Sequence, residues 1–216
     1  MTRILFAFLC ATTLTITAFS QTQNQPENAP VCNLSLSQAP AIRGIRLGMK
    51  PDEWLKLFPG SAQDEKIKAI LDQPPLYPNY GFNLVTFGFP SSSSSQFPYL
   101  PREEFQGVNY VALRLLDNQI AIFDVQYMPS PGGGNPWDDI SQLATIFSKA
   151  FNLPNIYAWK KEDSQRATLQ CSGFELRLEI DSGQPRAQLI SKPKVDQVIE
   201  QRREADKQKG RAAFKP

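Results

Sequence analysis

Along the chain, segments whose apolar residues have helical spacing are followed by segments with the pattern of strands. The first helical segment begins at Pro51. Proline suits the first position of a helix, because the N–H that it lacks would be unpaired there. Asp52 and Glu53 complement the positive end of the helix dipole. Four residues give this helix an apolar face before Pro59-Gly60 ends it, namely Trp54, Leu55, Leu57 and Phe58. A second short helix is predicted over residues 64–71.

Three strands are predicted next. Residues 82–89 are rich in aromatic and β-branched side chains, and residues 108–116 and 119–128 flank Asp117-Asn118, a two-residue hairpin turn. With that turn, one face of the hairpin carries Val111, Leu113, Leu115, Ile120 and Ile122, and the other carries Tyr110, Phe123 and Val125. Because strands with two apolar faces are central ones, both faces are predicted to be covered.

The same pattern restarts after residue 130. Pro131-Gly132-Gly133-Gly134 indicates a linker, and Pro136 is predicted to open a helix with Asp138 and Asp139 in its first turn. The apolar residues of this helix form one stripe, made of Ile140, Leu143, Ala144, Phe147, Ala150 and Phe151. Leu153-Pro154 ends the helix.

Residues 166–171, 174–181 and 184–191 predict a three-stranded meander with turns at Ser172-Gly173 and Ser182-Gly183. Two-residue turns bring five apolar pairs onto one face: Cys171 with Phe174, Leu169 with Leu176, Ala167 with Leu178, Leu178 with Ala187, and Leu176 with Leu189. The other face holds Glu175, Arg177, Glu179, Arg186 and Gln188. A shift of one residue would destroy this agreement, so the register is strongly specified.

Together these patterns predict a two-layer α+β fold, with helices packed against antiparallel sheet. The order of helix and then antiparallel strands occurs twice, which predicts tandem modules at residues 41–130 and 131–192 within one shared domain. Residues 193–216 are highly charged, and Val195, Val198 and Ile199 are placed to dock one helical turn. Beyond them we expect a solvated charged helix that frays into a tail.

The N-terminus has the pattern of a secretory signal. A positive charge at Arg3 precedes an uncharged apolar run that ends in Ala18-Phe19-Ser20. Residues 1–20 are therefore predicted to be a signal peptide, and residues 21–40 a flexible polar leader. The protein is thus expected to be exported, either periplasmic or secreted, with no transmembrane span after cleavage.

Removal of the signal leaves Cys32 and Cys171. An even count in an oxidising compartment favours a disulfide between them, and two separate thiols are the alternative. The chain contains no histidine, which excludes Ser-His-Asp and Cys-His catalysis and His-ligated zinc. The 23 Lys and Arg residues nearly balance the 21 Asp and Glu residues, so the composition does not favour nucleic-acid binding. We predict no cofactor and no metal.

The segment Ile45-Arg46-Leu47-Gly48-Met49-Lys50-Pro51 resembles the helix-opening motif of the SmpA/OmlA (BamE-like) envelope domains, where a Gly-Met pair precedes a short helix. The repeated helix-plus-sheet plan is similar to the tandem modules of the beta-lactamase inhibitory protein superfamily. The chain departs from the envelope lipoproteins, because it lacks a lipidation motif and has two modules where they have one. It also resembles uncharacterised exported bacterial proteins that share this helix start and a charged tail. The resemblance implies a fold and brings no activity with it.

Residues 90–107 show no helical or strand pattern. The serines at positions 91–95 favour mobility, whereas Phe97, Tyr99 and Leu100 between prolines are typical of a stiff apolar element that contacts a partner. Alternatively, these three residues fold back and cover the second apolar face of the hairpin. They are the candidate partner-binding residues of the sequence.

No set of polar residues converges on a catalytic site. The acidic pairs Asp52-Glu53 and Asp138-Asp139 lie at predicted helix starts, where carboxylates are favoured in any case. The sequence therefore favours an exported, non-enzymatic binding or assembly module whose partner is an envelope or extracellular protein. The alternative is an exported enzyme that uses carboxylate or tyrosine chemistry without histidine.

Overall fold

The computed structural model describes residues 31–72, 82–89, 95–129 and 139–213. The α-helices in these ranges are α1 (Pro51–Trp54), α2 (Glu65–Asp72), α3 (Ile140–Ala150) and α4 (Lys192–Ala213). The strands are β1 (Asn83–Gly88), β2 (Val108–Leu116), β3 (Gln119–Tyr127), β4 (Lys160–Lys161), β5 (Arg166–Gln170), β6 (Glu175–Asp181) and β7 (Gln184–Ile190). The predicted signal peptide, residues 21–30 of the leader and the linker at residues 131–134 lie outside the described residues.

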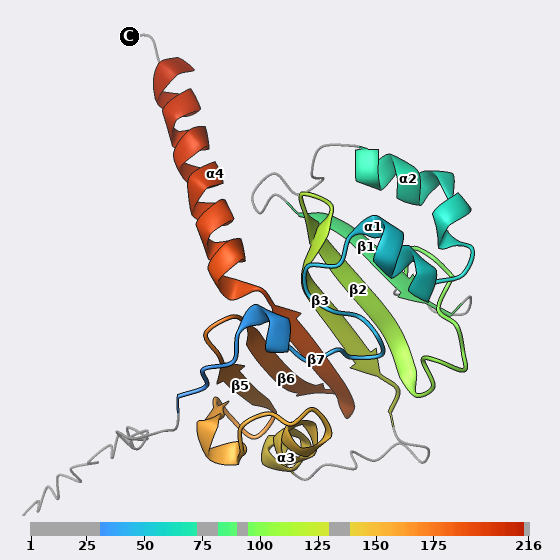
Figure 1. The fold of residues 1–216 in the computed structure, drawn as a ribbon, viewed down its shortest axis with the longest axis vertical. Helices are drawn as coiled ribbons and strands as arrows, with labels where there is room; N and C mark the ends of the chain where they lie inside the picture. The colour runs from blue at the N-terminus through green and yellow to red at the C-terminus, as the bar shows by residue number, and fades with distance from the viewer. Residues whose placement is uncertain (1–30, 73–81, 90–94, 130–138, 214–216) are drawn as a thin grey trace, which may run out of the picture.

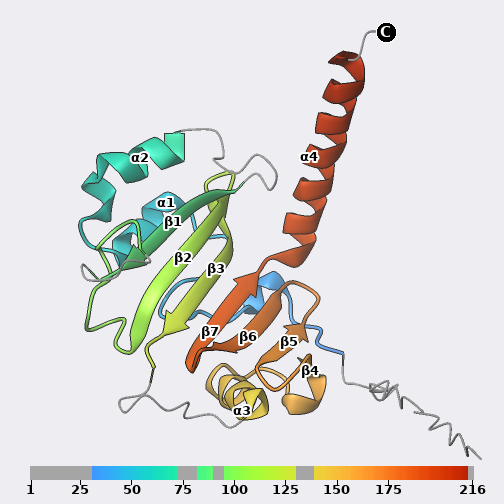
Figure 2. The same cartoon turned by 180° about the vertical axis from the view of Figure 1, so that it is seen from behind.

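All seven of these strands form one antiparallel sheet in the order β1-β2-β3-β7-β6-β5-β4 (Figure 1). The α+β prediction is confirmed. Because β3 pairs with β7, the strands of the two sequence halves share a single sheet. α2 contacts β1, and α3 contacts β5 and β6, so the helices of the two halves lie over opposite ends of that sheet (Figure 2).

One face of the sheet carries the hydrophobic core. A row of buried cross-strand neighbours on this face crosses six strands, through Phe87, Val111, Val125, Ala187, Leu178 and Ala167. Trp54 of α1, Ile67 of α2 and Phe147 of α3 belong to the same core. The helices α1, α2 and α3 therefore all cover this one face.

A β-bulge in β3 changes the predicted faces of the β2–β3 hairpin. The two-residue turn is confirmed, with both of its residues at positive φ (51° and 60°), as a type I′ turn requires. The register then shifts between Arg114 and Leu115 of β2, because Ala121 is an extra residue in β3. Phe123 consequently pairs with Leu113 on the core face, so the prediction that placed these two on opposite faces was wrong.

The meander of β5, β6 and β7 has the predicted register, and Leu169 pairs with Leu176 as expected. The turn before β6 requires glycine because another part of the backbone passes very close. A Cβ on Gly173 would lie 2.0 Å from the backbone N of Leu36. Residues 31–36, the described end of the predicted leader, thus run directly along this turn.

The starts of α1 and α3 explain two of the acidic pairs. α1 begins at Pro51 as predicted, and the Glu53 carboxylate accepts the Lys50 N–H at 2.8 Å. α3 begins at Ile140, so the prediction that placed Asp139 in its first turn was wrong: Asp139 is the extended N-cap, and its carboxylate accepts the Ser141 N–H at 2.7 Å. These carboxylates cap helices, as the sequence analysis favoured. Pro136 and Asp138, also predicted in this helix, lie outside the described residues.

α4 begins on the sheet and then leaves it. Val195, Val198 and Ile199 pack in a small cluster with apolar residues at the ends of β2 and β3. Beyond Ile199 the helix is mostly exposed and extends away from the sheet (Figure 1). The prediction of a docked turn followed by a charged helix is confirmed.

Candidate functional site

Cys32 and Cys171 form the disulfide that the sequence favoured, and their Cα atoms are 4.5 Å apart. Beside it the Ser172 N–H donates to the Cys32 carbonyl at 3.1 Å, and the Gly173 N–H donates to the Leu34 carbonyl at 2.9 Å. The bridge therefore fixes the N-terminal segment onto the β5–β6 turn. Since both sulfurs are bonded to each other, the site is structural.

The structure places the candidate partner-binding residues in or against the core. Phe97 and Leu100 are buried, and the backbone of Phe97 makes two hydrogen bonds of 3.0 Å to β1. Tyr99 is half-buried and donates its hydroxyl to Asp64 at 2.7 Å, a bond that lowers the pKa of Asp64 and raises that of Tyr99. Phe97 and Leu100 are therefore not exposed anchors, and the structure supports the alternative that this segment covers the core.

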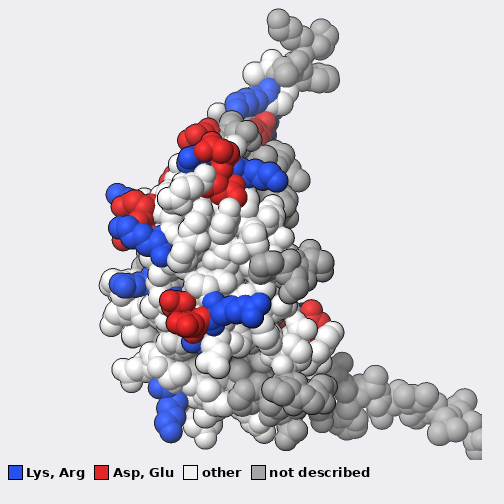
Figure 3. Space-filling view, turned by 90° about the vertical axis from the view of Figure 1, so that its right-hand side faces the viewer, with Lys and Arg blue, Asp and Glu red and all other residues white. Residues whose placement is uncertain are grey.

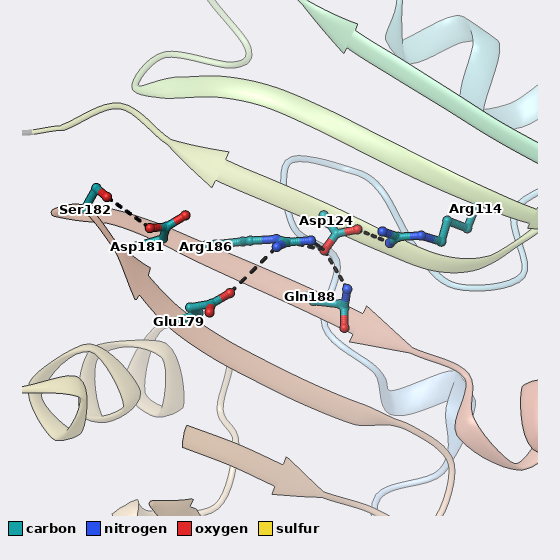
Figure 4. A network of polar contacts seen from close by, with 7 residues as sticks. All are labelled: Arg114, Asp124, Glu179, Asp181, Ser182, Arg186 and Gln188. Carbon is teal, nitrogen blue, oxygen red and sulfur yellow. Dashed lines mark hydrogen bonds and ion pairs between the residues drawn. The ribbon is translucent and has the colours of Figure 1, made fainter. Parts of the chain in front are cut away.

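The sheet face opposite the core carries a polar network centred on Asp124 (Figure 4). The buried Asp124 carboxylate accepts two hydrogen bonds from Arg186, at 2.6 and 3.0 Å, and one from Gln188 at 2.7 Å. It also accepts one from Arg114. Glu179 of β6 lies 3.7 Å from Arg186, which extends the network over four strands. The meander part of this face was predicted to be polar, as Arg186, Gln188 and Glu179 are, whereas the second face of the hairpin was predicted to be apolar and covered. The bulge in β3 turns Asp124 onto this face.

The charged groups in and around the polar network are paired with one another, which indicates a structural role. A shallow hollow of ≈ 300 Å³ beside it is lined by side chains of β5, β6 and β7. Its guanidinium groups already have acidic partners: Arg166 contacts Asp163, Arg177 contacts Glu175, and Arg186 contacts Asp124. Figure 3 shows a similar intermixing of positive and negative side chains on another face of the molecule. The hollow thus offers an anionic ligand no cation without an acidic partner.

A larger groove of ≈ 550 Å³ lies between α3 and the end of β3. One wall is formed by apolar residues of α3 and by Phe151 at its end, namely Leu143, Ile146, Phe147, Ala150 and Phe151. The other wall combines residues from separate segments, namely Ile42, Gly107, Tyr127, Met128 and Pro185. Met128 and Ile146, which both line this groove, are 42% and 45% exposed and are two of the five large apolar residues exposed in the described part of the chain.

Two polar side chains also line the groove. They are Arg43 and Tyr127; burial raises the pKa of Tyr127, and the positive charge of Arg43 partly offsets this shift. Arg43 donates to the carbonyls of Gln106 at 2.7 Å and Glu104 at 3.4 Å. Within the described ranges, no carboxylate forms an ion pair with Arg43, so none of these residues neutralises its charge.

Arg43 also has an unusual backbone conformation. It stands with Gly44 in a tight turn closed by Ile42 and Ile45, whose backbones exchange hydrogen bonds of 3.0 and 3.1 Å. Arg43 has φ of 54°, in the left-handed region where asparagine and glycine are the common residues. A long side chain held at such a position is a reason to test it for function.

No protein-family model, curated protein or solved structure matches the chain. Among the described residues, no helix is long and apolar enough to cross a membrane. No cluster of three or more Cys, Asp or Glu residues in those same ranges is arranged to hold a metal ion. The site is therefore judged from its geometry, which most closely matches a ligand groove with apolar walls and a few polar groups.

Sequence reasoning missed this groove, although it found one wall. The predicted stripe of α3 contains Leu143, Phe147, Ala150 and Phe151 of this wall, but it left out Ile146, which lines the groove and is exposed. The second wall draws on residues from four separate segments, which no local pattern brings together. The Arg43-Gly44 dipeptide was the available signal, because a two-residue segment with glycine between two isoleucines is typical of a tight turn.

Proposed function

We propose that this chain is an exported, non-enzymatic binding module that holds a segment of an envelope or extracellular protein in the groove between α3 and β3. The observation that carries the proposal is the groove itself. It is concave, it is lined mainly by apolar side chains, and its two most exposed large apolar residues, Met128 and Ile146, face solvent. Exposed apolar surface of this kind marks interaction sites in soluble proteins.

The enzyme alternative receives less support from the same site. Tyrosine chemistry at neutral pH needs a phenol that ionises readily, but burial raises the pKa of Tyr127. The carboxylates of Glu53 and Asp139 are engaged as helix caps, and that of Asp124 is surrounded by donors. A binding function requires none of these groups to react.

We also propose that the two halves are tandem modules of one plan, as the resemblance to SmpA/OmlA domains implies. Each half supplies helices followed by antiparallel strands. The Gly-Met pair of the motif lies before α1, where Gly48 has φ of 83° and its N–H donates to the Ile120 carbonyl at 2.7 Å. The motif thus joins the start of the first helix to the β2–β3 hairpin.

Site-specific photo-crosslinking in the exporting cell tests the binding function. A benzophenone amino acid at Ile146 should crosslink to one partner protein, because this side chain lies in the groove. The matched control is Thr145, which is exposed, lies about 100° around α3 from Ile146 and does not line the groove. A second substitution, Met128→Asp, should abolish the crosslink from position 146, since a charge would enter the apolar wall.

The identified partner is then measured against purified variants. Ile146→Asp should lower its affinity at least tenfold and leave the urea midpoint unchanged, because Ile146 is 45% exposed in the free protein. Equal crosslinking from positions 145 and 146, or an affinity that Ile146→Asp does not change, would contradict the proposal.

A further inference from the structure

We infer that the groove takes an amphipathic helix of the partner, and that an acidic side chain of that helix pairs with Arg43. This inference rests on the proposed binding function and specifies the chemistry of the partner. It follows from three features of the described residues: the way the sheet edges are covered, the shape of the groove, and the uncompensated charge at its rim.

The edges of the sheet leave little room for a partner strand. The free edge of β1 is occupied by the backbone of Phe97, which bonds to both sides of Phe87. The other edge strand, β4, has two residues, and both are lysines. Short, charged edge strands oppose strand addition, so an extended peptide has no suitable edge to extend.

The groove has the shape that a helix requires. One wall is α3, whose 11 residues make a helix about 16 Å long. A partner helix of about three turns alongside α3 would place apolar residues at i, i+3, i+4 and i+7 against Ile146, Phe147 and the facing Met128. Because Met128 and Ile146 of the groove are half exposed, a free acyl chain would keep part of its apolar surface in water, and this favours a helix that exposes its polar side.

The positive charge of Arg43, at the rim of the groove, favours an acidic residue on the partner helix. Arg43 uses two of its N–H groups on the carbonyls of Glu104 and Gln106, and the fork retains further donors. The nearby Tyr127 hydroxyl makes no hydrogen bond within the described residues and remains a second donor. A carboxylate on the partner helix would satisfy both groups at once.

Because the backbone of Arg43 is in the left-handed region, a substitution at this position can change binding without loss of the fold. Asparagine adopts the left-handed region more readily than arginine, so Arg43→Asn relaxes the turn while it removes the charge. The change also removes the two carbonyl contacts of Arg43, and relaxation of the turn should offset that loss in the urea midpoint. Arg43→Lys keeps the charge and removes the fork, and it serves as the conservative control.

The test is a selection from a displayed library of 14-residue helical peptides against the purified, disulfide-bonded protein. The enriched peptides should carry apolar residues at i, i+3, i+4 and i+7, with glutamate or aspartate at one end. In the best peptide, a change of glutamate to glutamine should weaken binding to the unsubstituted protein two- to fivefold, the range for an exposed ion pair. The same change should have no effect on Arg43→Asn, whose urea midpoint should not fall, and Arg43→Lys should retain part of the preference.

The outcomes separate this inference from the binding function. Enriched helices without an acidic preference, or a preference that persists in Arg43→Asn, would overturn the role of Arg43. Crosslinking from Ile146 together with a selection that enriches no helix would overturn the helical occupant and leave the binding function standing. Concentration-dependent self-association that Ile146→Asp abolishes would assign the groove to a second copy of this chain and refute the inference.

Discussion

Removal of the Cys32–Cys171 bridge is the sharpest test of the fold. The two cysteines are 139 positions apart, so the bridge closes a loop that contains most of the sheet. Loop-closure entropy for about 140 residues corresponds to a stabilisation of about 5 kcal/mol. Since single domains unfold with only about 5–15 kcal/mol in total, the double variant Cys32→Ala/Cys171→Ala should be strongly destabilised.

Urea denaturation of the oxidised protein and the double variant measures this difference. The denaturant slope should rise in the variant, because an unbridged unfolded chain exposes more surface. Gly173→Ala is a matched local control: it displaces the same N-terminal segment by steric overlap with Leu36 but keeps the bridge. A loss below about 1 kcal/mol in the double variant would refute this reasoning, since it would show that the unfolded chain gains little freedom when the loop is opened.

Three further outcomes are expected. Phe97→Ala should cost about 3–5 kcal/mol in a urea melt, because the ring is buried, whereas an exposed anchor would cost almost nothing. Asp124→Asn should cost about 3 kcal/mol by the same assay, as it leaves the Arg186 guanidinium without its buried counter-ion. Hydrogen bonding from Lys161 is the main cause that lowers the pKa of Asp139 to about 2, so the stability from this cap is complete above the unfolded value near 3.8 and is lost as pH falls towards 2. An NMR titration should show that pKa, and Lys161→Met should raise it; an unchanged value would contradict the assigned cause.

The β2–β3 hairpin and the β5–β7 meander were predicted with unequal accuracy, and the reason is physical. In the meander, the apolar and charged residues alternate without interruption, so only one register satisfies both faces. In the β2–β3 hairpin the turn was just as clear, but both faces looked apolar from Tyr110 to Val125. Nothing in that pattern marks Ala121 as the extra residue, because alanine is acceptable on either face. This one bulge reversed the assigned faces of Ile122, Phe123 and Val125.

The candidate site residues were also predicted with unequal accuracy. The cysteine pair was predictable because removal of the predicted signal peptide leaves a single possible bridge. The segment around Phe97 was identified as unusual, yet composition alone does not distinguish an apolar element that contacts a partner from one that contacts its own core. The deciding contact, a backbone bridge to Phe87, depends on where β1 ends in space.

The groove is a property of the joined halves and of neither half alone. Tyr127 and Met128 come from the end of β3 in the first half, whereas α3 and Pro185 of β7 come from the second. The pairing of β3 with β7 sets the distance between these walls, and the contact of Asp124 with Arg186 reinforces that pairing from the opposite face. A single helix-plus-sheet module would possess α3 or the β3 wall, but not both. If the halves are tandem modules, the binding surface arose where they share a sheet, and an activity inferred from one module alone would not include it.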